Sequence, residues 1–133
     1  MRRETARRMV LGGAGAGILV AGLAVHAVGV GPVAGFAGDA LYAALIFVLV
    51  ALVAPRLPSL GAASIALGFC ALIELLQLTP VPAALSRSIP GASLVVGSTF
   101  QWSDLAAYTI GAALAGMIDT VVRRHARGIP ASD

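Results

Sequence analysis

Four long apolar runs, separated by short polar or proline-containing segments, dominate the chain. They cover residues 9–30, 37–54, 60–78 and 100–122, and the first contains no formally charged residue. An α-helix rises about 1.5 Å per residue, so about 20 apolar residues cross a hydrocarbon core of about 30 Å. The pattern therefore predicts four membrane-spanning helices.

Glycine and proline positions set the expected limits of the second span. Residues 31–38 contain Pro32 and three glycines, which is typical of a short turn. The second helix is therefore expected to begin near residue 37. This start places Asp39 in the first turn, where the positive end of the helix dipole favours an acid.

Proline also ends the second and third spans, at residues 55–58 and 79–82. Residues 83–99 then form the longest connection. Within it the apolar triplet 94–96 is a candidate for a short segment at the membrane interface.

The composition excludes most soluble classes of protein. The chain has 133 residues, of which 59% are hydrophobic and 11% charged, and its mean hydropathy is +0.94. Soluble domains carry about a quarter charged residues. Nine arginines against six acids give a basic balance, but no basic patch alternates with exposed aromatics, so nucleic-acid binding is not expected. The single cysteine, Cys70, offers neither a disulfide nor metal-ligand spacing and is expected to pack in the core.

The arginines indicate the orientation of the chain. Eight of the nine lie in residues 1–8, at Arg56 or in residues 123–133, and Arg87 is the exception. Cytoplasmic loops carry an excess of basic residues, so residues 1–8 are predicted to be a cytoplasmic leader and residues 123–133 a cytoplasmic tail. Residues 9–122 form the transmembrane domain. The predicted fold is an all-α, antiparallel bundle of four transmembrane helices with both termini cytoplasmic. A signal peptide also begins with a basic leader and an apolar run, but the chain stays apolar afterwards.

This topology places the polar residues of all four helices at one level, in the outer leaflet. Within three of the helices they are spaced by three or four positions and so share a face. The set comprises His26, Asp39, Tyr42, Glu74, Gln77, Asp104 and Tyr108.

Carboxyl groups at this level need partners. A carboxylate within a membrane helix costs about 2.5–3.5 kcal/mol on insertion scales, so such groups normally face the bundle interior. Three neighbouring carboxylates cannot all stay ionised without cations or shared protons. Three alternatives stay open: some carboxyls are protonated, Arg87 folds over them, or a cation binds.

Each polar residue also has a purely structural interpretation. Asp39 and Asp104 can act as helix caps, Asp104 can pair with Arg87, and His26 can bond a neighbouring helix or headgroup. Glu74 is the hardest to explain in this way because it lies deepest. At the cytoplasmic end, Asp119 precedes Arg123 by four residues, which predicts an interfacial ion pair.

Small residues recur on two helix faces, at Gly13 and Gly17 and again at Gly111 and Ala115. Such faces allow close approach of helices and permit a homo-oligomer.

No established catalytic motif occurs: there is no GxSxG, no HExxH and no P-loop. No residue is therefore assigned as catalytic, and neither a metal site nor a cofactor is predicted.

Three blocks in order resemble the DUF2809 family of small bacterial integral membrane proteins. They are GDALY at residues 38–42, IELLQL at 73–78 and FQWSDL at 100–105, with Tyr108 and Gly111 following. The resemblance implies a multi-pass protein of the bacterial cytoplasmic membrane with no assigned activity.

Two further positions agree with that family and one differs. Arg87 and Gly97 fall where members tend to have arginine and glycine, whereas Ala92 and Ser93 replace a frequent Gly-His pair. More distantly the chain is similar to VanZ-like proteins, which are associated with low-level resistance to teicoplanin, a lipoglycopeptide. That similarity implies a role in the cell envelope and not a particular reaction.

The predicted function is binding of a polar ligand or lipid headgroup in an outer-leaflet pocket. The expected partners are membrane lipid and an envelope lipid or glycopeptide-type ligand. The expected lining is Glu74, Gln77, Asp104, Tyr108, Asp39, Tyr42, Arg87 and His26. Two alternatives stay open: a membrane enzyme using Glu74 or Asp104 as acid or base on an envelope lipid, and a subunit of a small oligomeric transporter.

Overall fold

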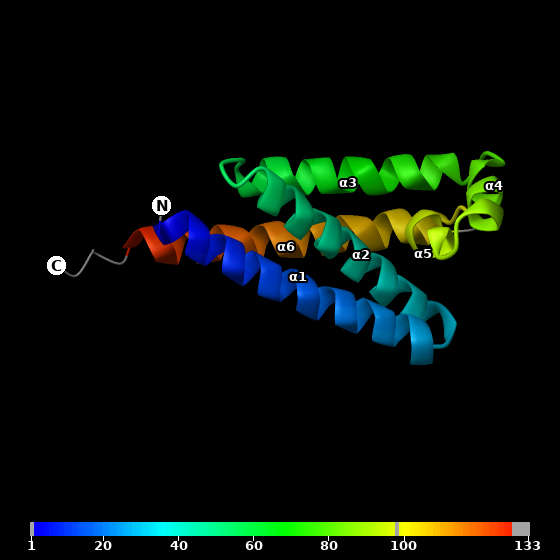
Figure 1. The fold of residues 1–133 in the computed structure, drawn as a ribbon, viewed down its shortest axis with the longest axis horizontal. Helices are drawn as coiled ribbons and strands as arrows, with labels where there is room; N and C mark the ends of the chain where they lie inside the picture. The colour runs from blue at the N-terminus through cyan, green and yellow to red at the C-terminus, as the bar shows by residue number, and fades with distance from the viewer. Residues whose placement is uncertain (1, 98, 129–133) are drawn as a thin grey trace.

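The computed structural model describes residues 2–97 and 99–128, and these form six α-helices joined by short turns (Figure 1). The helices are α1 (Arg2–Val28), α2 (Gly31–Val53), α3 (Ser59–Leu76), α4 (Val81–Ser88), α5 (Ala92–Val96) and α6 (Trp102–Gly128). Four of them, α1, α2, α3 and α6, are long and apolar enough to cross a membrane. The prediction of a helical membrane protein with four candidate spans is confirmed.

The second helix begins earlier than predicted. It starts at Gly31, not near residue 37, and Pro32 occupies its first turn. Proline is tolerated there because the first backbone N–H groups of a helix have no partner within the helix. The reversal of direction falls at residues 29–30, and Gly31 has a φ of +83°, which favours glycine. Asp39 therefore lies well inside α2 and does not cap it.

The first and last long helices, α1 and α6, are longer than the predicted membrane spans. The described part of the predicted leader belongs to α1, which is continuous from Arg2. At the other end α6 carries Arg123, Arg124 and His125 in helix as far as Gly128. Residues 129–133 of the predicted tail lie outside the described residues.

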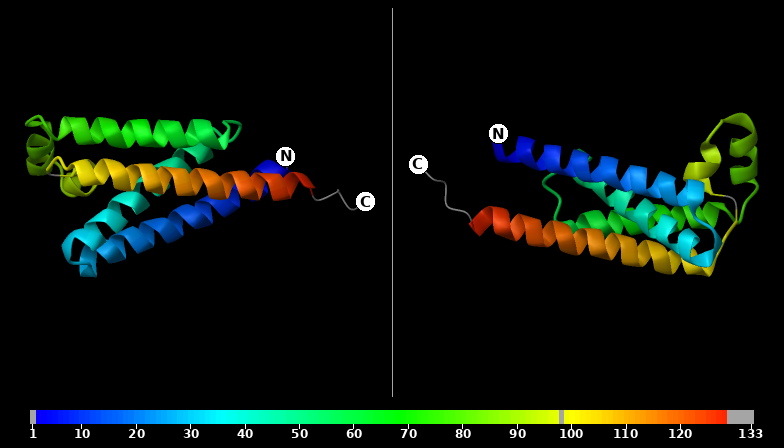
Figure 2. Two further views of the ribbon diagram at one scale, coloured as in Figure 1. Left: turned by 180° about the vertical axis from the view of Figure 1, so that it is seen from behind. Right: turned by 90° about the horizontal axis from the view of Figure 1, so that it is seen from below.

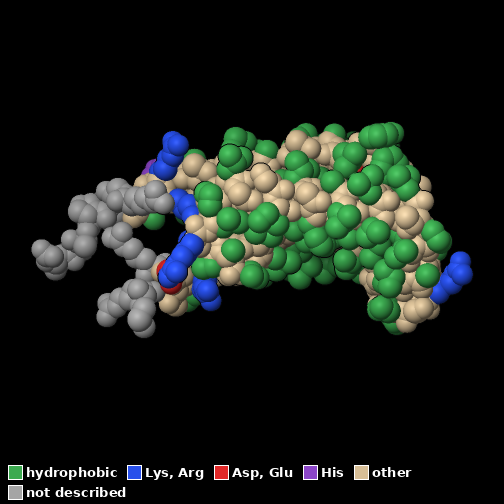
Figure 3. Space-filling view, turned by 90° about the horizontal axis from the view of Figure 1, so that it is seen from above, with side chains coloured by type: hydrophobic (Ala, Val, Ile, Leu, Met, Phe, Trp, Pro, Cys, Tyr) green, Lys and Arg blue, Asp and Glu red, His purple; other side chains and the backbone are tan. Residues whose placement is uncertain are grey.

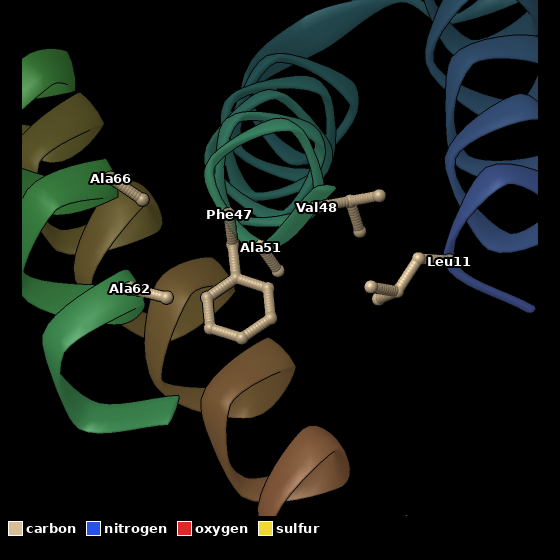
Figure 4. Packing of buried hydrophobic residues seen from close by; sticks show 6 residues of the cluster. All are labelled: Leu11, Phe47, Val48, Ala51, Ala62 and Ala66. Atoms are coloured by element: carbon tan, nitrogen blue, oxygen red, sulfur yellow. The ribbon is translucent and has the colours of Figure 1, made fainter. Parts of the chain in front are cut away.

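The α2 helix is central to the bundle. It packs against α1 on one side and against α3 and α6 on the other, as the two views in Figure 2 show. Phe47 and Ala51 of α2 pack beside Ala62 and Ala66 of α3, while Val48 faces Leu11 of α1 (Figure 4). The small alanine side chains on α3 leave room for the large ring of Phe47 on α2, so that large and small side chains complement each other at this contact.

The connection between α3 and α6 forms two short helices, α4 and α5, at one end of the bundle (Figure 1). The triplet 94–96 lies in α5, whereas α4 was not predicted from the sequence.

The surface agrees with a membrane environment. Aliphatic side chains cover the flank of the bundle, and arginines gather at the end where the described parts of α1 and α6 begin and finish (Figure 3). Val53 and Leu60, for example, are 85% and 79% exposed. A soluble protein rarely leaves so much apolar surface in water, whereas lipid solvates it at no cost.

The two small-residue faces differ in their use within the chain. A Cβ atom at Gly111 would clash with the backbone carbonyl of Ala40, so this glycine is the point of closest approach between α2 and α6. A Cβ atom at Gly13 or Gly17 would meet nothing within 4 Å. Gly111 is therefore in close contact with α2, whereas Gly13 and Gly17 have no such neighbour.

Candidate functional site

A cavity of about 740 Å³ lies at the end of the bundle where α4 and α5 are located. Its walls come from α1, α2, α3, α5 and the start of α6. It is lined by six of the eight residues that the sequence predicts for the pocket: His26, Asp39, Tyr42, Gln77, Asp104 and Tyr108. Helices far apart in the sequence therefore bring their polar side chains to one hollow.

Two carboxyl groups face this cavity from different helices. Asp39 of α2 and Asp104 of α6 are close enough to interact directly, and Glu74 contributes to the same electrostatic cluster. Asp104 lies in the first turn of α6 and accepts a hydrogen bond from Ser103 Oγ at 3.0 Å. Among the described residues, no arginine or histidine lies within ion-pairing distance of Asp39 or Asp104.

Glu74 supports the cavity from behind. Its side chain is fully buried and does not line the hollow. One carboxyl oxygen accepts the backbone N–H of Gln101 at 2.7 Å, and the other accepts the Tyr108 hydroxyl at 3.3 Å. Tyr108 in turn packs against Tyr42, with ring centroids 6.3 Å apart. Glu74 thus holds the start of α6 and one cavity-lining ring in position.

The α5 segment is hydrogen-bonded over the cavity by side chains of α2 and α3. The Tyr42 hydroxyl donates to the Val95 carbonyl at 3.0 Å, and Gln77 Nε2 donates to the Val96 carbonyl at 2.8 Å. The other amide atom of Gln77, Oε1, is buried and has no hydrogen-bond partner among the described residues. These two bonds position the backbone of α5 as one wall of the cavity.

Gly97 makes this arrangement possible. Its backbone, with φ of 68° and ψ of −168°, lies in a region that is essentially restricted to glycine. A Cβ atom here would also come 2.5 Å from Gln77 Nε2. The backbone conformation and the nearby Gln77 side chain therefore explain why a glycine is needed at residue 97.

Replacing Gly97 with alanine is expected to loosen α5 while the four long helices stay folded. Backbone strain of about 1–3 kcal/mol adds to the loss of the Gln77 bond, so hydrogen exchange at residues 92–97 should accelerate. Gly91→Ala is the matched control, because Gly91 also has a positive φ, of 79°, but its Cβ would meet nothing within 4 Å. Equal acceleration in both variants would contradict a role for the Gln77 contact.

Arg87 and His26 take different places from each other. Arg87 is exposed on α4, does not line the cavity, and makes no ion pair with Asp104. Of the three alternatives for the carboxyl groups, folding of Arg87 over them therefore finds no support in the contacts of the described residues. His26 is exposed near the end of α1 and contributes to the cavity rim.

A second polar cluster lies at the opposite end of the bundle. Asp119, only 7% exposed, accepts hydrogen bonds from Ser59 Oγ at 2.6 Å, Arg123 Nε at 2.8 Å and Arg7 Nη2 at 3.2 Å. The two arginines also donate to the carbonyls of Pro55 and Leu57. The predicted Asp119–Arg123 ion pair is confirmed, with a larger network around it.

Sequence reasoning missed two parts of these clusters. Gln101 lines the cavity and supplies the amide that Glu74 accepts. Its place inside the FQWSDL block, next to Asp104, was the available signal. Arg7 reaches Asp119 across 112 positions in the chain, and no local spacing could indicate that pair.

No group of three histidine, cysteine, aspartate or glutamate side chains is placed to hold a metal ion in the part of the chain that the structure describes. The arrangement instead offers acidic and hydroxyl groups around a hollow. Carboxylate groups accept hydrogen bonds from amines and hydroxyls, and the tyrosine hydroxyls can both donate and accept them.

No solved structure matches the chain. A sequence profile described as a protein of unknown function (DUF2809) matches residues 28–112. The matched segment runs from the end of α1 to the middle of α6 and contains Asp39, Glu74 and Asp104, whereas Arg7 and Asp119 lie outside it. Because the match spans more than half of its length, the chain belongs to the DUF2809 family of uncharacterised membrane proteins.

Proposed function

We propose that the protein binds the headgroup of a membrane lipid, or a similar polar ligand, in the cavity lined by Asp39 and Asp104. The observation that carries this proposal is the position of Asp39. It lies in the interior of α2, so it does not cap the helix, and none of the described basic residues pairs with it. Ionisable side chains within a membrane span are rare and generally mark functional sites.

The chemistry of the lining favours a cationic or hydroxyl-bearing ligand. Two carboxyl groups and the Tyr42 and Tyr108 rings face the hollow, and Arg87 does not contribute to it. An ammonium group gains from both carboxyl groups and from aromatic faces. An anionic ligand would find no arginine there, so the balance favours amine- or hydroxyl-rich headgroups of the envelope.

We further infer the orientation from the arginines. The bundle end with Arg7, Arg56 and Arg123 is the cytoplasmic one by the positive-inside rule, so both termini are cytoplasmic and successive spans alternate in direction. The cavity at the opposite end then opens at the outer leaflet of a bacterial cytoplasmic membrane. A headgroup at this depth needs no path across the hydrocarbon.

The position of Glu74 argues against the alternative of an acid–base enzyme that uses it. A catalytic acid or base must reach a substrate atom within hydrogen-bond distance. Both oxygens of Glu74 are engaged by Gln101 and Tyr108, and the side chain does not line the cavity. Binding therefore accounts for the geometry better than catalysis by Glu74.

Thermal stabilisation by lipids of defined headgroup tests the proposal. Cys70 is the only cysteine and is buried, so a thiol-reactive fluorescent dye reports unfolding directly. In a polyoxyethylene detergent, dioctanoyl phosphatidylethanolamine is expected to raise the unfolding temperature more than dioctanoyl phosphatidic acid does. A ligand at about 100 times its Kd stabilises by about 2.7 kcal/mol.

The double variant Asp39→Asn, Asp104→Asn should remove the difference between the two lipids. Glu4→Gln is the matched control, because Glu4 is an exposed acid at the other end of the bundle, paired with Arg56 at 3.8 Å. An equal response to both lipids in the wild-type protein, with dioctanoyl phosphatidylglycerol also giving no preference, would exclude headgroup recognition.

A further inference from the structure

A second, larger hollow lies next to the cavity. It is a groove of about 1200 Å³ lined by residues of α1, α2 and α6. Ile18 and Leu41 line both the groove and the polar cavity. The two hollows are therefore neighbours that share a wall at these two side chains, and Leu41 lies only two residues from Asp39.

The groove is apolar along nearly all of its length. Its walls include Val10, Leu11, Ala14, Leu114, Ile118 and Val122. Along α6 it extends from Gly111 to Ala126, which is roughly 22 Å at 1.5 Å per residue. This length exceeds half of a hydrocarbon core of about 30 Å, so a whole lipid chain fits within it.

The far end of the groove is lined by the polar cluster. Arg7, Asp119 and Arg123 lie there, and their hydrogen bonds to one another and to Ser59 tie α1 to α3 and α6. The groove thus lies between a polar cavity that offers two carboxyl groups and a second, ion-paired cluster.

From this adjacency we infer that the ligand is a single amphiphile, whose headgroup occupies the polar cavity and whose hydrocarbon chain lies in the groove between α1 and α6. The inference rests on the proposed function, since it assumes a headgroup between Asp39 and Asp104. It adds the class of ligand, which is a lipid held by its chain as well as its headgroup and not a soluble polar molecule.

The fold explains why this groove stays open. α1 packs chiefly against α2 and has few contacts with α6, and the described residues that line the groove come mainly from α1, α2 and α6. Small residues on the α1 wall, such as Ala14, widen it further. A chain that slides in from the membrane side exchanges contacts with other lipid for contacts with three helices.

Photo-crosslinking with two phosphatidylethanolamine probes tests this inference on the whole protein in lipid nanodiscs. One probe carries a diazirine near the glycerol and the other at the end of one chain, and labelled peptides are located by mass spectrometry. The chain-end probe is expected to label groove residues of α1 and α6, about five-fold or more above the lipid-exposed face of α3. Excess unlabelled phosphatidylethanolamine should abolish that labelling, and phosphatidic acid should not.

Two variants separate the chain from the headgroup. Ala14→Trp, which fills the groove, should remove labelling by the chain-end probe and leave labelling of the cavity by the glycerol probe. Ala16→Trp is the control, because Ala16 is also exposed on α1 but lines neither hollow. If Ala14→Trp fails to fold, competition between the unlabelled lipids on the wild-type protein still decides.

The outcomes also separate this inference from the proposed function. Headgroup-selective labelling of the cavity, with the chain end on the outer face of α3, would overturn the groove and keep the headgroup site. Groove labelling that is insensitive to the headgroup, or to Asp39→Asn with Asp104→Asn, would show a nonspecific lipid groove and overturn the inference. A groove protected by a second copy of the chain, seen as protein–protein crosslinks between α1 and α6 in place of lipid labelling, would overturn it as well.

Discussion

Asp119→Asn is expected to lower the free energy of unfolding by about 3 kcal/mol, since removing one partner of a buried ion pair typically costs about 3–5 kcal/mol. The lower end applies here because freed arginines near a membrane surface can still reach phosphate groups. Asp119 is 7% exposed, and Arg7 and Arg123 are 20% and 18% exposed. The substitution leaves two guanidinium groups without their carboxylate.

The measurement is unfolding in detergent followed by dye labelling of the buried Cys70. Glu4→Gln removes an acid from an exposed pair at 3.8 Å and should change stability by less than about 1 kcal/mol. A double-mutant cycle of Asp119→Asn with Arg7→Gln should give a non-additive result, because the two side chains share a hydrogen bond. Additive effects would show that the network contributes little as a unit.

The consequence for the fold is specific to α1. This helix packs mainly on α2, and the Arg7–Asp119 pair is its link to α6 at that end of the bundle. Weakening the pair should therefore increase hydrogen exchange in the first turns of α1 more than in α3. The same change would widen the groove beside α1.

Gly111→Ala is the second substitution expected to have a large effect, a loss of about 3 kcal/mol. Overpacking usually costs about 1–3 kcal/mol, and here the new Cβ would clash with the Ala40 carbonyl, a backbone group that cannot rotate away. The helices α2 and α6 must then separate. Asp39 lies next to Ala40, so lipid-dependent stabilisation should fall together with stability.

Two other glycines provide graded controls for this prediction. A Cβ at Gly116 would approach Ala63 Cβ at 3.3 Å, and one at Gly13 would meet nothing within 4 Å. We expect the order of destabilisation Gly111→Ala, then Gly116→Ala, then Gly13→Ala, with the last within about 1 kcal/mol of wild type. A comparable loss for Gly13→Ala would contradict the assignment of Gly111 as the point of closest approach.

Local sequence signals gave the spans but not all of their ends. The apolar runs predicted four helices, and Pro55 and Pro58 marked the end of α2 correctly within a residue or two. Pro32 was misleading, because proline in the first turn of a helix does not interrupt it. The helices α1 and α6 continue through the charged residues at their ends, because arginine has a high helix propensity.

The site shows the same division. Spacings of three and four residues placed Asp104 with Tyr108, and Glu74 with Gln77, on shared faces, and depth counting then brought most of the polar residues to one level. The sequence did not distinguish residues that line the cavity from residues that hold the lining in place, so Glu74 was expected to line the pocket. It is fully buried behind Tyr108 instead, because which face of α3 meets α6 is decided by packing.

The sequence by itself determined the apolar environment of the protein, the number of candidate spans and the depth of the polar residues along the helices. Each of these follows from hydrophobicity and helical rise along one segment. Only the tertiary structure decided three other features. Asp39 faces the cavity with Asp104, Arg87 does not line the cavity, and Arg7 is hydrogen-bonded to Asp119. These features depend on contacts between segments distant in the chain, which are fixed by the shapes of whole helix faces, above all where Gly111 lets α6 approach α2.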